Sequence, residues 1–541
     1  MTIHAYLFEI RAIQQFLFSS GKLKDMAAGS ELIDYLCNAP LAKALEICNL
    51  AGYHEPIHSP RCSGGVFYLL IEDGERAGHF RNLWSVMVTQ LLPGVELIDA
   101  LTSAASAREA ISTGLGVLRD ARNLRYPQLP AASPLGLRCP RTGEVAIARD
   151  QREPVDAATY RKREFRRPSA SAPLVSRFCN EADYKWPDNF EAGSLADRLF
   201  PLGADNLVGL IHADGNGLGE ILRTINLAAQ TADDEQYTRL YRYFSDGLDS
   251  AMCKAAQAAC GDVLLPASQH HVVPARPLVM GGDDLTLLVR ADLAIPFVAA
   301  FLRYFEIETK RFVTDLREQM RAMNLDEAVV DTLPDGLTAC AGITYMKASQ
   351  PFSQCYDLAE GLCARAKNAS RACVTAGAVQ MPSSLAFHKL QGSHIGDAEA
   401  LFDLELVVGG QRQQGKAGLQ IGLPVYGLDG AGRLPAIDSL IDLAACFTQG
   451  KLNHKRLRSI ATLLHVDPTL ASTDYIRWRA LAQRESSLKV ALEDFDQCLD
   501  QLLGSTSARL PADQSESSSP LADLLVYLSI HGTSVMEAEN D

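Results

Sequence analysis

The sequence predicts an α+β protein with two ferredoxin-like domains in tandem, an insertion between them and a mainly helical C-terminal domain. Two observations support this class. Strand and helix patterns follow the order strand, helix, two strands, helix, strand twice along the chain, and helical periodicity dominates its last part. A chain of 541 residues is also too long for one hydrophobic core. We therefore expect domains at residues 1–125, 126–200, 201–388 and 389–541.

The first copy of this order lies in residues 1–125. Its patterns predict strands at 5–10, 66–71 and 95–98, and helices at 27–50, 79–91 and 105–124. The segment from Pro127 to Pro173 is rich in proline and charge and has little periodicity. We expect this segment to be an insertion or linker.

The second copy lies in residues 201–388. It has predicted strands at 207–212, 278–280, 285–289 and 337–346, and predicted helices at 218–229, 236–259, 295–323 and 352–372. Further helical patterns follow at 439–464, 473–503 and 521–530. A serine-rich polar stretch at 505–519 is expected to be flexible.

Composition restricts where the protein works and what it binds. No apolar run is long enough for a membrane helix, and Glu9 and Arg11 interrupt the apolar N-terminus, so we expect a cytoplasmic protein without a membrane contact. A formal charge of −14 excludes a protein that coats nucleic acid with its whole surface. The 13 cysteines include no Cys-x-x-Cys pair, and we expect them to be reduced thiols.

Two basic clusters are candidates for a local contact with RNA or another phosphate-rich partner. A solvated face or a linker is the alternative for each of them. The clusters are Arg161, Lys162, Arg163, Arg166 and Arg167, and then Lys451, Lys455, Arg456 and Arg458.

A hairpin with two glycines and two acids is the sharpest local signal. Gly281 and Gly282 permit a tight turn and the close approach of a ligand. Asp283 and Asp284 add two carboxylates, which are hard oxygen ligands suited to Mg²⁺ or Mn²⁺. A plain acidic turn is the alternative.

A third carboxylate, Asp214, stands at the exit of the predicted strand 207–212. Gly215, Asn216 and Gly217 then form a turn into a helix, which would direct backbone N–H groups toward a triphosphate. If this strand lies beside the hairpin, the three carboxylates can hold two metal ions about 4 Å apart, which would activate a 3′-hydroxyl and steady a pyrophosphate leaving group. Taken alone, Asp214 has an N-cap as its alternative role.

Lys367 lies on the predicted helix 352–372, which follows the strand at 337–346. It can reach the triphosphate as a point charge. A solvated helix lysine is the alternative.

In combination, these motifs resemble the large polymerase/cyclase subunit of type III CRISPR effector complexes. The catalytic palm of that family has a strand ending in Asp-Gly-x-x-x-Gly, a Gly-Gly-Asp-Asp hairpin, a Gly-Ile strand and an Ala-Lys helix. Residues 9–16 and 24–33 resemble the opening of the family's first, degenerate palm. The matching positions of the catalytic palm are Asp214 to Gly219, Gly281 to Asp284, Gly342-Ile343 and Ala366-Lys367.

The resemblance implies two palm domains and the conversion of ATP into cyclic oligoadenylate messengers on two Mg²⁺ or Mn²⁺ ions. It implies guide or target RNA and other effector subunits as partners, and it makes Ser30 a candidate nucleotide contact. The hairpin of the first copy keeps both glycines but has Val66 and Phe67 where the second copy has acids. We therefore expect the first palm to bind nucleotide without catalysis.

The sequence departs from this family in two respects. It contains no His-Asp dipeptide, so we do not expect cleavage of DNA by an HD nuclease domain. Many members also have a zinc site with paired cysteines, whereas Cys139 has only Cys179 nearby, and His270 and His271 could join it only through the fold. We therefore expect no zinc there.

Two other functions stay open. One is a scaffold subunit of an RNA-guided complex that binds nucleotide without turning it over. The other is a GGDEF-like cyclic dinucleotide synthase, which the Asp-Asp pair followed by Leu285 fits poorly.

Overall fold

The structure is a computed structural model, and it divides into two compact units. The first unit comprises residues 1–200, 217–287 and 304–337, and the second comprises 201–216, 288–303 and 338–541. No helix in the described part of the chain combines the length and the apolar character needed to span a bilayer. The described residues are 2–53, 55, 58–124, 136–165, 173–181, 183–188, 207–230, 232–375, 380–390, 392, 398–408, 419–430, 434–448, 452–503 and 518–531.

A four-stranded sheet organises the N-terminal part of the first unit. Its strands follow the order β2-β3-β1-β4, and β1 runs antiparallel to both β3 and β4. The first strand thus lies between the third and the fourth, as the predicted βαββαβ order requires. The strands are β1 (Ile3–Arg11), β2 (Arg61–Ser63), β3 (Val66–Ile71) and β4 (Glu96–Ala104).

Two helices, α4 (Gly74–Leu91) and α5 (Ala107–Ala121), pack on this sheet and contact both β1 and β4. Each begins where a side chain caps it: the carboxylate of Asp73 accepts from two backbone N–H groups of α4, and the hydroxyl of Ser106 accepts from one of α5. The core between the sheet and α4 is fully buried and aromatic. It consists of Tyr6, Phe8, Phe67, Phe80 and Trp84.

The single helix predicted at 27–50 is in fact two, α2 (Leu23–Leu36) and α3 (Ala39–Ile47). A shorter helix, α1 (Ile13–Phe18), precedes them. Asn38 leaves the helical region, with φ −108° and ψ −106°, and Pro40 opens the second helix. Proline lacks the N–H that a continuous helix needs there, so the break follows from this residue.

The predicted insertion contains regular structure that its sequence pattern did not indicate. A hairpin of β5 (Ala146–Asp150) and β6 (Glu153–Asp156) leads into α6 (Ala157–Phe165), and α7 (Pro173–Phe178) follows. The segment therefore contains regular elements, and its interpretation as an insertion or linker stays a prediction. Residues 127–135 and 166–172 of the predicted insertion lie outside the described residues.

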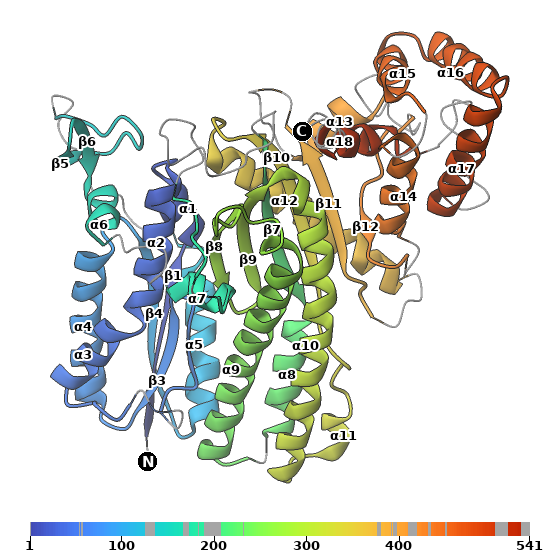
Figure 1. Ribbon diagram of the computed structural model, residues 1–541. Coiled ribbons are helices and arrows are strands. Elements are labelled where there is room, and N and C mark those ends of the chain that lie inside the picture. The colour runs from blue at the N-terminus through green and yellow to red at the C-terminus, as the bar shows by residue number, and fades with distance from the viewer. Residues whose placement is uncertain are drawn as a thin grey trace. The chain divides into compact units, whose positions relative to one another are not determined.

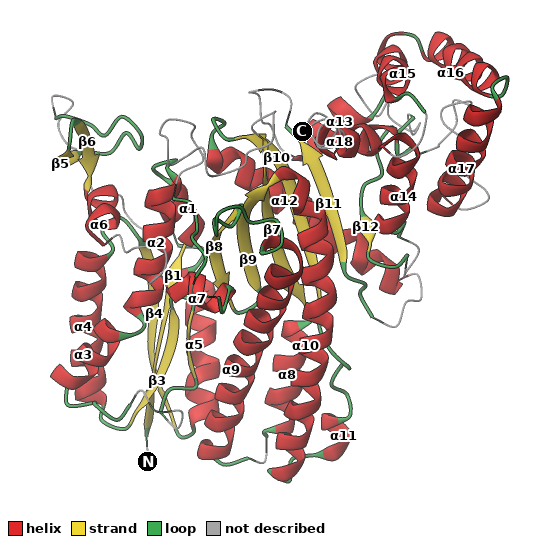
Figure 2. Ribbon diagram, viewed as in Figure 1, coloured by secondary structure: helices red, strands yellow, loops and turns green. Residues whose placement is uncertain are grey.

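The rest of the first unit is largely helical (Figure 2). A reciprocal pair of hydrogen bonds between Asp233 and Gln236 caps the helix α9. Strand β9 and helix α10 contribute residues to both units. The elements are α8 (Leu218–Ala228), α9 (Asp234–Ala259), a π-turn (Cys260–Leu264), β8 (Ala275–Gly281), β9 (Asp284–Arg290), a 3-10 turn (Ala291–Leu293), α10 (Ala294–Ala322) and α11 (Glu327–Val330).

The second sheet repeats the strand order of the first and extends it. Its order is β12-β11-β10-β7-β9-β8, so β10-β7-β9-β8 corresponds to β4-β1-β3-β2. Strand β10 runs antiparallel to β7 and parallel to β11. The remaining strands are β7 (Leu207–Asn216), β10 (Thr338–Lys347), β11 (Ser384–Lys389) and β12 (Tyr426–Gly427).

Helix α12 (Phe352–Thr375) packs on β10, β7 and β11 (Figure 1). Gly342 on β10 allows this packing. A Cβ atom there would collide with the carbonyl oxygen of Ala359 and lie 2.6 Å from the backbone nitrogen of Cys363. The absence of a side chain therefore sets how closely α12 approaches the sheet.

The C-terminal part of the second unit is mainly helical, as predicted. Asp467 caps α16 with its carboxylate, and Pro468 occupies the first position of that helix, which separates it from α15. The predicted flexible stretch 505–519 lies outside the described residues except for 518–519. The helices are α13 (Ala398–Leu406), α14 (Ile437–Thr448), α15 (His454–Val466), α16 (Pro468–Ala482), α17 (Ser486–Leu503) and α18 (Leu521–His531).

Candidate active site

Strand β7 ends in polar residues that share one face. His212, Asp214 and Asn216 alternate along the strand, so their side chains point to the same side of the sheet. In the antiparallel register, Asp214 lies opposite Cys340 of β10. The side-chain amide of Asn216 donates to Thr338 Oγ1 at 3.1 Å and fixes the end of the strand.

Lys367 of α12 reaches Asp214. Its Nζ donates to Asp214 Oδ2 at 2.5 Å and to the carbonyl oxygen of Gly215 at 3.0 Å. Both side chains remain partly accessible, 28% for Lys367 and 35% for Asp214. The close packing at Gly342 carries α12, and with it the ammonium group, to the end of β7. Two of the predicted site residues are thus brought together.

Two buried groups complete the surroundings of Asp214. Burial lowers the pKa of His212 to about 4, and Lys367 adds to this effect, while Asp214 opposes it. The imidazole is therefore neutral at neutral pH, and its Nδ1 lies 3.4 Å from the hydroxyl of Tyr356. Asn216 Oδ1 is buried without a hydrogen-bond partner among the described residues, so an unused oxygen ligand lies on this face.

Two glycines in the predicted turns have a positive φ angle, which glycine adopts without steric strain. Gly217 starts α8 with φ 86°, and Gly282 has φ 63°. Because β8 ends at Gly281 and β9 begins at Asp284, the hairpin loop consists of only Gly282 and Asp283. The predicted arms 278–280 and 285–289 are therefore confirmed, joined by a two-residue turn.

The hairpin of the first copy, between β2 and β3, shows that its predicted alignment with the β8–β9 hairpin was shifted by one residue. Its loop is Gly64 and Gly65, with φ of 60° and 78°. Counted from the strand ends, Gly65 and Val66 occupy the positions of Asp283 and Asp284, whereas the glycine pattern had suggested Val66 and Phe67. Strand ends fix the correspondence better than glycines, because a two-residue loop can keep one glycine or two. The first copy lacks both acids in either alignment.

The two glycine hairpins approach each other within the first unit. A Cβ atom on Gly281 would lie 3.6 Å from the Cα of Gly64. Glu9, on the central strand of the first copy, pairs across the sheet with Val66 and accepts from Arg122 at 2.6 Å. A cation at the end of α5 thus neutralises this acid, as Lys367 of α12 does for Asp214.

Ser30, the predicted nucleotide contact of the first copy, is only 8% exposed on α2. The acids on either side of it have internal partners. Glu31 accepts from Arg276 of β8 at 3.3 Å, and both of these side chains are buried. Asp25 is ion-paired with Arg163 of α6.

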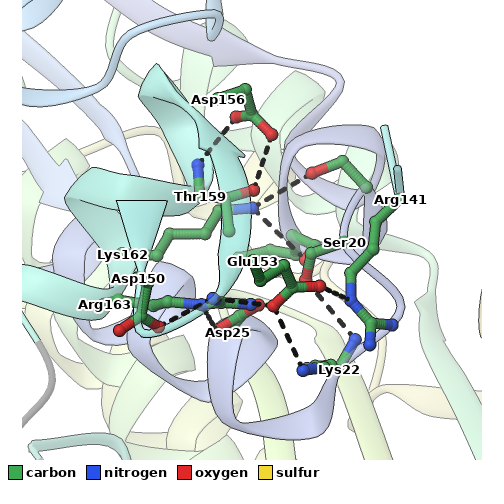
Figure 3. Close-up of polar contacts among 12 residues, drawn as sticks. Ser20, Lys22, Asp25, Arg141, Asp150, Glu153, Asp156, Thr159, Lys162 and Arg163 are labelled. Carbon is green, nitrogen blue, oxygen red and sulfur yellow. Dashed lines mark hydrogen bonds and ion pairs between the residues drawn. The ribbon is translucent and has the colours of Figure 1, made fainter. Parts of the chain in front are cut away.

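Two members of the first basic cluster, Lys162 and Arg163, are engaged inside the protein, so neither is available for the predicted RNA contact (Figure 3). Lys162 is fully buried, and its Nζ donates to the carbonyl oxygens of Phe16 and Leu17 and to Ser19 Oγ. Gly29 leaves room for this lysine, because a Cβ there would lie 3.2 Å from Lys162 Cε. Lys162 therefore fastens α6 to the end of α1.

Arg163 forms the centre of the same network. It binds both carboxylate oxygens of Asp25 at 3.0 and 3.1 Å, Asp150 at 2.8 Å and Glu153 at 3.0 Å. Burial would raise the pKa of Glu153, but hydrogen bonds from Arg141 and Arg163 lower it to about 2. Of the remaining members of the cluster, Arg161 pairs with Glu164, and Arg166 and Arg167 lie outside the described residues.

Cys139 lies in a tight turn next to this network. Its N–H donates to the carbonyl of Glu144 at 2.8 Å, and it receives the N–H of Gly143 at 2.9 Å. Within the described ranges, no three His, Cys, Asp or Glu side chains are gathered so that they could hold a metal ion. Asp214 belongs to no such group, and its carboxylate is instead ion-paired with Lys367.

Comparison with known proteins shows the fold. No protein-family model matches the chain, and no curated protein matches it. Chains of the Csm1-Csm4 cassette in complex with one ATP, with cA3 and with pppApA align with TM-scores of 0.53, 0.52 and 0.51. The alignments cover 98% of this chain and 70%, 69% and 69% of the others, at 14%, 13% and 13% identity. This chain therefore shares the mixed α+β fold of those structures.

Proposed function

We propose that the protein is a metal-dependent nucleotidyltransferase of the palm type. It would convert ATP into cyclic oligoadenylate-type messengers and release pyrophosphate, in type III CRISPR or related antiviral defence. The observation that carries the proposal is the sheet order. It makes β7, which carries Asp214 two residues before its end, the neighbour of β9, which begins at Asp284.

One contact between β7 and β9 supports a shared site for the three carboxylates. A Cβ on Gly209 of β7 would lie 3.5 Å from Val289 Cγ1 of β9. The corresponding strands of the first copy, β1 and β3, are antiparallel. If β7 and β9 are antiparallel too, counting five residues along each strand from this contact leads to Asp214 and Asp284, with Asp283 next in the turn. We expect these acids to act together.

We expect a pair of Mg²⁺ or Mn²⁺ ions to draw these residues together, because the described residues contain no preformed group of three such ligands. Asp214, Asp283 and Asp284 would hold them, and the buried Asn216 Oδ1 offers a further hard oxygen nearby. Bound metal ions would supply activation of a 3′-hydroxyl and stabilisation of the pyrophosphate. Lys367 would neutralise Asp214 until a metal binds, and its ammonium group would then turn to a phosphate of ATP.

The similar structures favour ATP as the substrate, because they are complexes with one ATP, with pppApA and with cA3. They also suggest other effector subunits, with guide or target RNA, as partners. A non-catalytic scaffold would have no reason to keep adjacent acids that repel each other. A GGDEF-like synthase fits the doubled strand order less well.

The first copy would bind a second nucleotide without catalysis. It has no carboxylate at the hairpin, and Glu9 alone cannot hold two metals. Its glycine hairpin lies against Gly281 of the catalytic hairpin, so a nucleotide beside Gly64 would be close to that turn. Ser30 remains a proposed contact for it.

A product assay tests the proposal. The purified protein would be incubated with Mg²⁺ or Mn²⁺ and each nucleoside triphosphate, with and without RNA, and the products identified by mass spectrometry. We expect oligoadenylates from the natural protein and none from the Asp283→Ala, Asp284→Ala double variant, at an unchanged melting temperature. Asp335→Ala, whose carboxylate is 83% exposed, is the matched control. Turnover by a folded double variant would refute the assignment.

A further inference from the structure

A cavity of about 690 Å³ lies within the second unit, where β11, α13, α15 and α18 meet (Figure 1). Its lining includes His388 and Lys389 at the carboxyl end of β11. The proposed active site does not use any of its lining residues.

The cavity is separate from Asp214. Cys340 of β10 pairs with Asp214 on one side and with Ser384, the first residue of β11, on the other. Lys389 stands five residues farther along β11, which is about 16 Å at the usual rise of a strand. A ligand of this cavity would therefore occupy a second site.

One wall of the cavity is basic. Helix α15 presents Arg458, Ala461, Thr462 and His465 to it, which is the spacing of a single helix face. No acidic residue occurs between His454 and Val466 in the sequence. This face includes Arg458 of the second basic cluster, whose partner the sequence did not reveal.

Lys389 and two hydroxyl groups add to the basic wall. The Nζ of Lys389 donates to Ser529 Oγ of α18 at 3.0 Å, and both residues line the cavity. Thr462 provides a second hydroxyl on the facing helix. Cations and hydroxyl donors together are the groups that bind phosphate oxygens.

Both acids in the lining have hydrogen-bond partners of their own. The carboxylate of Glu405 lies 3.0 Å from Nε2 of the buried His388. Asp523 is 5% exposed, and its carboxylate accepts from the backbone N–H of Leu423 and from the hydroxyl of Tyr426. Burial raises the pKa of Asp523 to about 7, which reduces its charge at neutral pH. Asp523 therefore opposes the basic side chains of the lining less than a fully charged carboxylate would.

Apolar side chains form another part of the lining, the apolar wall, which consists of Leu404, Leu406, Ile421 and Val526. Sites for small organic ligands have this character: a volume of about 300–1,000 Å³, mostly apolar walls and a few directed polar groups. A bare phosphate ion would leave the apolar wall without a contact. A ligand with a flat apolar part and a phosphate group would use both walls.

We propose that this cavity binds the phosphate ester of a nucleotide, with Arg458 and Lys389 on the phosphate and the apolar wall against the base. His465 and Thr462 lie on the same helix face as Arg458 and add donors. The nucleotide can come from free solution or from a single-stranded RNA, because both carry the same group.

Binding measurements on the full-length chain test this site. The probes are inorganic phosphate, AMP and a short single-stranded RNA, each measured by equilibrium dialysis with the natural protein and its variants. Arg458→Glu reverses a lining charge, and Ala461→Trp fills the cavity without a charge change. Arg477→Glu on α16 and Ser459→Trp on α15 make the same changes at exposed positions outside the lining.

Arg458→Glu should weaken AMP or RNA binding by roughly tenfold or more because a charge-assisted contact is lost, and Ala461→Trp should do so because the indole occupies the space of the ligand. Both controls should stay within about twofold. If the cavity variants lose AMP binding, the ligand is a free nucleotide. If they lose only RNA binding, the ligand is a phosphate of RNA. Equal binding by folded cavity variants, or equal loss in the controls, would overturn the proposal. The Asp283→Asn, Asp284→Asn protein should keep this binding site, which separates it from the proposed catalysis.

Discussion

At the scale of single residues, each copy of the repeated fold neutralises the acid of its first strand with a cation from its last helix. Arg122 does so for Glu9, and Lys367 does so for Asp214. The spacing of the motifs predicted that Lys367 belongs near the site, but not that it binds Asp214. That contact depends on the depth at which α12 packs, which sequence periodicity does not encode.

Replacing Lys367 should have opposite effects on metal and on nucleotide. In Lys367→Ala, Asp214 loses its internal cation, so the affinity for Mn²⁺ should rise by up to about tenfold, because the metal no longer displaces an ammonium group. The affinity for ATP and the turnover should fall. Titration with Mn²⁺ and kinetics with ATP measure the two effects. Arg371→Ala, an exposed position on the same helix, should change neither, and an unchanged Mn²⁺ affinity in Lys367→Ala would contradict the role of the lysine.

At the scale of elements, prediction succeeded where a pattern was local. The range of β3 matches its prediction, and most helices were located to within a few residues, because alternation and amphipathic spacing are visible in short windows. It failed in the insertion. There, α6 is held by ion pairs to Asp25, more than a hundred residues away, and such partners leave no periodic signal.

Gly342 should not tolerate even one methyl group. In Gly342→Ala the new Cβ would collide with the backbone of α12, so the helix must shift. We expect a loss of about 1–3 kcal/mol in the free energy of unfolding, as for other overpacked cores, together with a loss of turnover as Lys367 moves. Gly116→Ala, a helix position with open space around it, should be neutral or slightly stabilising. Equal stability of the two variants would show that α12 packs less tightly than described.

The network around Arg163 should be essential for stability. Arg163→Met leaves the buried carboxylate of Asp25 without its partner, which costs about 3–5 kcal/mol for a broken buried pair. Urea unfolding would measure this cost. Arg161→Met, two positions earlier in α6 and ion-paired only at the surface, should change stability by less than about 1 kcal/mol. If the two arginine variants unfold alike, the insertion is not fastened through this network.

At the scale of the whole molecule, the repeat of the strand order was predictable and the roles of many charged residues were not. The acid and glycine motifs mark both hairpins in the sequence. By contrast, the basic run at Arg161 to Arg163 resembles a solvated face, and only the fold shows that Lys162 is buried. Charged residues are ambiguous in sequence because their partners come from distant segments. The cavity at Arg458 was hidden for the same reason, since its walls come from four separate elements.

Stability should depend on pH through Asp523. Burial raises its pKa from the ordinary value of 3.8 to about 7, so between these values the folded protein keeps a proton that the unfolded chain has lost. The contribution of Asp523 to stability is therefore present at low pH and declines as pH rises from about 4 to about 7. Asp523→Asn removes this dependence and can keep the contacts with Leu423 and Tyr426 through its carbonyl oxygen. Relative to the natural protein, the variant should be more stable at pH 8 than at pH 5, measured as the shift of the urea midpoint. Asp438→Asn, at an exposed ion pair, should show no such difference. A shift for Asp523→Asn that is the same at both pH values would mean that the carboxyl group is not kept protonated by its burial.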